Sequence, residues 1–131
     1  MKIKNSLSWS GFLGASSVVV LALAAHALEK KLEIEQLNAV KTAGQIQLFH
    51  AIALLSMSML SEKFPMQFEK AMKLMIYGTI MFSFSIYLIV FKDTSGLEFL
   101  KFLWPITPIG GLVLILSWIS IIVESRSIEK S

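Results

Sequence analysis

Six polar side chains that could do chemistry lie within or beside long apolar stretches of this 131-residue sequence. They are His26, Gln47, His50, Ser83, Tyr87 and Thr107. Polar groups inside a membrane often mark proton or solute pathways, and imidazole is a common ligand of metals and of haem iron. These residue types therefore suggest three kinds of site: a metal or haem centre, a polar pathway, or a hydrogen-bonded contact between helices.

The two histidines differ in depth. His26 lies near the end of the first apolar run, whereas His50 lies well inside the second, which runs in the opposite direction. At 1.5 Å per residue their depths differ by about 9 Å, which is too much for both to ligate one iron. The chain has no cysteine, which removes thiolate metal sites. We therefore expect no metal and no cofactor, and we expect the histidines to make structural hydrogen bonds.

Two further activities depend on these polar residues. A small-solute or ion permease with a polar interior around Gln47 and His50 is the alternative function, although no acidic side chain lies deep in a run to relay protons. An enzyme would need a nucleophile with a base, or paired carboxylates. No serine has such a setting, and Glu29, Glu33 and Glu35 are typical of a solvated connector. We expect no catalytic residue and no enzymatic activity.

Four apolar runs must position these side chains, at residues 7–28, 42–61, 74–91 and 108–123. At 1.5 Å per residue the first run is about 33 Å long, enough to cross a hydrocarbon core of about 30 Å. Hydrophobic residues make up 55% of the chain, and its Lys and Arg lie between or beyond the runs. The sequence therefore predicts an all-α polytopic membrane protein of one domain, a compact antiparallel bundle of four transmembrane helices.

The segments between the runs carry their own signals. Residues 29–41 are charged but have apolar residues at helical spacing, which fits either an interfacial turn or an extension of the next helix. Residues 92–96 are typical of a turn, and residues 97–104 form an amphipathic aromatic segment suited to the interface. Thr107 is a suitable N-cap and Pro108 a suitable first residue of the fourth helix.

The basic residues predict the orientation. The N-terminal segment, the connector at 62–73 and the tail together carry more Lys and Arg than the other two connectors, which favours two cytoplasmic termini. The net charge is +3, but there is no arginine cluster or basic aromatic patch. We therefore expect the basic residues to meet anionic lipid headgroups, and we expect no nucleic-acid partner.

Small residues predict where the helices pack. Gly11, Ala15 and Ala22 fall on one stripe of the first helix, and Gly110 with Gly111 allows close approach to the fourth. Since lipid provides little hydrophobic drive for helix association, such surfaces are the expected seams. The function we expect is therefore packing against a membrane-protein partner, a second copy of the chain, or lipid.

Several segments resemble one family. The matching pieces are residues 25–28, 47–55, 82–88 and 106–111, followed by Trp118. In order and spacing they resemble the YgdD/YwdK-type small bacterial inner-membrane proteins, domain of unknown function family 423, and the Thr-Pro-Ile-Gly-Gly piece is the most specific. The resemblance implies four spans and a location in the bacterial cytoplasmic (inner) membrane. It supplies no activity and no catalytic residue.

Overall fold

A computed structural model describes residues 1–64 and 68–128 of the chain. These residues form helices joined by short connections, with no strand among them. The elements, in order, are α1 (Ile3–Ala25), α2 (Ile34–Lys63), α3 (Glu69–Thr79), the π-helix η1 (Ile80–Phe84), α4 (Ser85–Ser95), the 3-10 helix η2 (Glu98–Leu103) and α5 (Ile106–Ser125). The predicted all-α class is confirmed.

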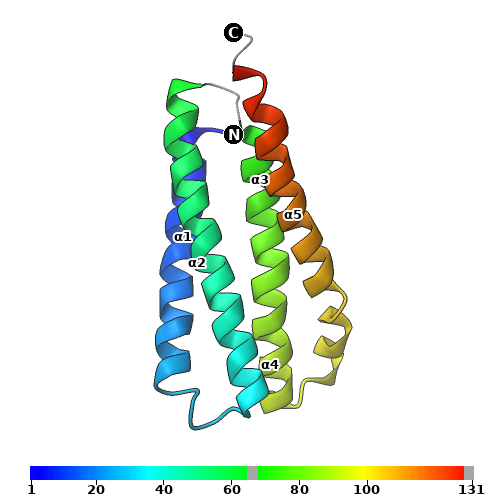
Figure 1. Ribbon diagram of the computed structural model, residues 1–131. Coiled ribbons are helices and arrows are strands. Elements are labelled where there is room, and N and C mark those ends of the chain that lie inside the picture. Colours follow the sequence, from blue (N-terminus) through cyan, green and yellow to red (C-terminus); the bar gives the residue numbers. More distant parts are fainter. Residues whose placement is uncertain (65–67, 129–131) are drawn as a thin grey trace.

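The helices form four antiparallel rods, because α3, η1 and α4 continue one another without a break (Figure 1). The start of α1, the end of α2 and the end of α5 lie together at one end of the molecule. The α1–α2 connection and η2 lie at the other, which we call the connector end. Among the described residues, four helices are long and apolar enough to cross a membrane.

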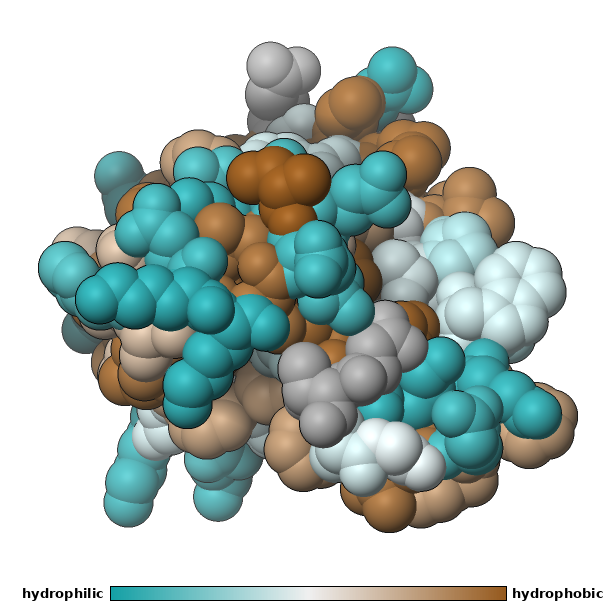
Figure 2. Space-filling model, turned by 90° about the horizontal axis from the view of Figure 1, so that it is seen from below, coloured by the Kyte–Doolittle hydropathy of each residue, from teal (hydrophilic) through white to brown (hydrophobic). Residues whose placement is uncertain are grey.

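The second and third rods occupy the middle of the bundle. Of the most apolar stretch of each rod, 44% is buried in α2 and 39% in the α3–α4 rod, against 22% in the first and fourth. Large apolar side chains consequently cover the outside, where the bilayer takes the place of water. Hydrophilic side chains gather at the connector end, where Figure 2 looks along the bundle.

The interior is layered. One apolar cluster lies toward the end that holds the chain termini and includes Leu13, Leu54 and Met75. A second lies toward the connector end and includes Val40 and Val90. The buried polar side chains of the candidate site lie between these two clusters along α2.

Residues 34–41 of the predicted connector extend the second helix, whereas residues 29–33 form turns before it. Glu33 is the N-cap of α2, and it exchanges capping-box hydrogen bonds with Gln36. These bonds satisfy donors that a helix start leaves unpaired. Leu37 and Val40 are then buried within the extended helix, so α2 begins at Ile34, whereas the apolar run begins only near residue 42.

Two predicted helix boundaries are wrong. Thr107 does not cap the last helix, because α5 already begins at Ile106 with Pro105 as its N-cap. Residues 92–96 do not form a turn, because α4 continues to Ser95. The helix ends instead at Gly96, whose φ of 74° places it in the left-handed conformation that glycine adopts without a steric penalty.

The close approach of α5 to the third rod explains one glycine. A Cβ atom on Gly110 would lie 2.4 Å from the backbone nitrogen of Phe82, closer than packing allows. Gly111 is looser, since its Cβ would lie 3.7 Å from the Phe82 ring. Gly110 therefore lets α5 lie against the π-helical turn with backbone nearly touching backbone.

Candidate functional site

Gln47 is the centre of the buried polar cluster. Its side chain is fully buried in the middle of α2. The amide nitrogen Nε2 donates to the carbonyl oxygen of Leu13 at 2.8 Å and to Oγ of Ser16 at 2.6 Å, both on α1. The amide oxygen Oε1 accepts the hydroxyl of Tyr87, on α4, at 2.8 Å. One side chain thus joins three of the four rods.

Two serines add interhelical bonds on either side of Gln47. Ser10 of α1 donates to the carbonyl oxygen of Ala51 at 2.9 Å, and Ser83 of η1 donates to that of Ala43 at 2.9 Å. Both acceptors are backbone groups of α2. Because hydrocarbon cannot satisfy a hydroxyl, these bonds favour the observed register of α1 and η1 against α2.

His50 is held between two hydrogen bonds that fix its tautomer. The indole Nε1 of Trp118, on α5, lies 3.2 Å from His50 Nε2, and an indole N–H can only donate. His50 Nε2 therefore accepts, and Nδ1 carries the proton that it donates to the carbonyl oxygen of Ile46 at 2.6 Å. In this arrangement the ring is neutral and both of its nitrogens are used.

Thr107 and Ser85 form the contact that ties α4 to the start of α5. Their hydroxyl oxygens lie 2.6 Å apart. Ser85 also bonds to the carbonyl oxygen of Phe82, within its own rod. The Thr107 hydroxyl, expected to cap a helix, bonds across helices instead.

His26 lies apart from this cluster. It follows the last residue of α1, where its backbone nitrogen bonds to the carbonyl oxygen of Leu23, and its side chain is exposed. The structure therefore brings together five of the six candidate polar residues in the interior of the bundle and leaves His26 at the connector end. No group of three or more His, Cys, Asp or Glu within the described residues is arranged to hold a metal ion.

The small-residue stripe of α1 faces outward. Gly11, Ala15 and Ala22 are all exposed, and a Cβ atom on Gly11 would meet nothing within 4 Å. The buried face of α1 instead carries Ser10 and Leu13, roughly 140° around the helix at about 100° per residue. Within this chain the expected seam is thus replaced by a serine-containing face, on which the hydroxyl of Ser10 bonds to the carbonyl oxygen of Ala51 across the contact.

Sequence reasoning missed Ser85, the partner of Thr107, and three further members of the cluster. Ser10, Ser16 and Trp118 each contact α2 or one of its side chains. A signal for Ser10 was present, since Ser10 and Ser17 are seven residues apart and share the buried face with Leu13. The indole of Trp118 shares its turn with Ser117, whose hydroxyl bonds to the carbonyl oxygen of Leu114 within α5.

Comparison with known proteins identifies the family. The family model described as "Protein of unknown function (DUF423)" matches residues 20–111, which is most of the chain. The chain belongs to the DUF423 family. The matched region of this DUF423 protein contains Gln47, His50, Ser83, Tyr87 and Thr107, and it ends at Gly111.

Three curated relatives of the DUF423 chain are named membrane proteins. A UPF0382 membrane protein of Haemophilus influenzae is 32% identical over 92% of this chain and 90% of its own length. YwdK of Bacillus subtilis is 34% identical over 79% and 81%, and the inner membrane protein YgdD of Escherichia coli is 26% identical over 99% and 95%. No solved structure matches. Together with the four apolar helices, these relatives make the chain a multi-pass membrane protein of uncharacterised activity.

Proposed function

We propose that this protein acts by packing the outward face of α1 against a transmembrane helix of a neighbouring protein, in the first instance a second copy of itself. The observation that carries the proposal is the exposed small-residue stripe of Gly11, Ala15 and Ala22. Helix association in lipid depends on close approach, and Gly11 and Ala15 have the small-xxx-small spacing that permits it.

The state of the polar cluster favours packing over permeation. Gln47 uses both its amide nitrogen and its amide oxygen within the bundle, and both ring nitrogens of His50 have partners. A solute crossing here would have to displace these bonds one after another. We therefore assign the cluster the role of holding the rods in register, with no catalytic role for any of its members.

The proposal includes a location in the bacterial inner membrane with both termini in the cytoplasm. The relative YgdD is named an inner membrane protein. The start of α1, the end of α2, the start of α3 and the end of α5 lie at the same end of the molecule (Figure 1), and they carry Lys4, Lys63, Lys70 and Lys73. This arrangement suits the excess of positive charge that cytoplasmic segments carry.

Cysteine cross-linking in membranes tests the packing proposal, because the chain has no native cysteine. Ala15→Cys should form a disulfide-linked dimer under mild oxidation, since two facing residues of closely packed helices fall within the Cα separation of about 4.4–6.8 Å that a disulfide needs. Leu23→Cys is the matched control, because Leu23 is also exposed on α1 but lies about 100° around the helix from the centre of the stripe.

Two results would count against the proposal. Equal dimer yield from Ala15→Cys and Leu23→Cys would indicate random collision in the membrane. A purification in mild detergent that repeatedly recovers the chain alone and monomeric, with no cross-linked species from Ala15→Cys, would also remove it. Gly11→Leu should abolish the dimer while leaving the monomer folded, because space is open around that position.

A further inference from the structure

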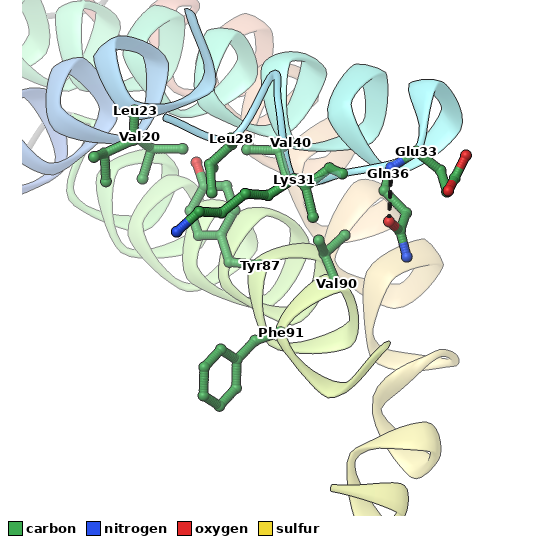
Figure 3. A pocket seen from close by; sticks show the side chains of 11 residues that line it. Val20, Leu23, Leu28, Lys31, Glu33, Gln36, Val40, Tyr87, Val90 and Phe91 are labelled. Carbon is green, nitrogen blue, oxygen red and sulfur yellow. Dashed lines mark hydrogen bonds between the residues drawn. The ribbon is translucent and has the colours of Figure 1, made fainter. Parts of the chain in front are cut away.

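A cavity opens at the connector end of the bundle. Its volume is about 740 Å³, within the range of roughly 300–1,000 Å³ that small-molecule sites occupy. Its apolar walls come from three rods and include Val20 and Leu23 of α1, Val40 of α2, and Val90 of α4 (Figure 3). The cavity therefore offers an apolar slot between helices.

The slot extends from the interface into the membrane. Tyr87 lines its inner part and lies about two turns before the end of α4, which corresponds to a depth of about 12 Å. The hydroxyl of Tyr87 is already bonded to Gln47. The inner part of the slot therefore offers mainly apolar contact to an occupant.

One cation faces this slot without a counterion. Lys31, from the α1–α2 connection, lines the cavity, and its side chain runs across the opening in Figure 3. Within residues 1–64 and 68–128 its ammonium group has no ion-pair partner. The nearby Glu33 carboxylate is engaged in the capping box of α2 and points away from the opening.

We propose that this cavity binds one anionic phospholipid of the surrounding bilayer. The phosphate lies at Lys31, at the level of the headgroups, and one acyl chain fills the slot between α1 and α4. Net charge decides between occupants: the phosphate of a zwitterionic lipid is already balanced by the cation of its own headgroup, whereas the phosphate of an anionic lipid is left to the ammonium of Lys31. The acyl chain supplies apolar contacts to the walls of the slot.

Native mass spectrometry of the full chain in a charge-neutral detergent tests this proposal, with dioleoyl phosphatidylglycerol and dioleoyl phosphatidylcholine titrated separately. Lys31→Ala should weaken binding of the phosphatidylglycerol about fivefold, which is the effect of one lysine near an anionic headgroup. Lys30→Ala is the matched control: it removes the same charge from the adjacent exposed residue, which does not line the cavity. Its affinity should stay within about twofold of the parent chain.

A second variant tests the acyl-chain slot without changing the charge. Leu23 lines the cavity and is 47% exposed, so Leu23→Trp should fill the slot while leaving the helices folded, as checked by circular dichroism. It should weaken phosphatidylglycerol binding although Lys31 is intact. An unchanged affinity in this folded variant would overturn the placement of the chain.

Three further results would overturn the proposal. They are equal binding of the two lipids by the parent chain, equal losses in Lys31→Ala and Lys30→Ala, and Lys31-dependent binding of oleate with none of phosphatidylglycerol. The last would assign the cavity to a free fatty acid. None of the three variants changes the stripe of Gly11, Ala15 and Ala22, so the outcome is independent of the dimer proposal.

Discussion

Replacing Gln47 is the most direct test of how the rods are joined. Gln47→Leu keeps a side chain of similar length in a fully buried position but removes the amide. Three interhelical hydrogen bonds are lost at once, to Leu13, Ser16 and Tyr87. At about 0.6 kcal/mol for each such bond in a membrane, the free energy of unfolding should fall by about 2 kcal/mol.

Tyr87→Phe measures the contribution of a single bond, against which the loss in Gln47→Leu is compared. It removes one of the three bonds of Gln47, the one from the Tyr87 hydroxyl, so the loss should be about 0.6 kcal/mol. Both variants are measured by equilibrium unfolding of the full chain in mixed micelles, with circular dichroism as the readout. Ser56→Ala is the control, because the Ser56 hydroxyl is exposed and bonds only to the carbonyl oxygen of Ile52 in its own helix.

The ratio of the two losses in unfolding free energy shows whether Gln47 joins three rods. If Gln47→Leu destabilises the protein no more than Tyr87→Phe does, the amide is not a three-way junction. If Ser56→Ala costs as much as either variant, the assay reports a general effect of removing polar groups.

Three other substitutions should have effects of predictable size. Gly110→Ala should lower stability by about 2 kcal/mol, because its Cβ would lie 2.4 Å from the backbone of the third rod, whereas Gly111→Ala should be nearly neutral; chemical unfolding compares the pair. Gly96→Ala should cost about 1 kcal/mol for its left-handed conformation in the same assay, and a larger loss would point to contacts as well. Trp118→Phe should shift the ¹⁵N resonance of His50 Nε2 by removing its donor, and an unchanged resonance would contradict the assigned bond.

The number and class of the helices follow from composition alone. Runs of about 20 apolar residues have few alternatives to spanning a membrane, since every backbone polar group must be satisfied there. Placing Gln47, His50, Ser83 and Tyr87 toward a shared interior follows from the same reasoning. Their hydrogen-bond partners could not be predicted, because the sequence does not show how each rod is rotated about its own axis.

The outward stripe of α1 shows why those rotations were not predictable. The spacing of Gly11, Ala15 and Ala22 shows that they share a face, but lipid and helix are both apolar, so the spacing does not say which of the two that face meets. In water the burial of the more hydrophobic face would have decided the question. The position of Thr107 failed for a related reason: a hydroxyl near a helix start can cap its own helix or bond to another, and here the proximity of Ser85 decides.

The π-helical turn at residues 80–84 makes the third rod sensitive to its length. Such a turn holds one residue more than the α-helical ladder needs, so everything after it is rotated by about 100° relative to an unbroken helix. Deleting a single residue there would leave an equally apolar span of nearly the same length. The phenol of Tyr87 would nevertheless rotate away from α2, and the amide oxygen of Gln47 would lose its hydrogen-bond donor. Deleting one residue from this turn should therefore destabilise the bundle more than many substitutions would, although it barely changes the hydropathy of the span.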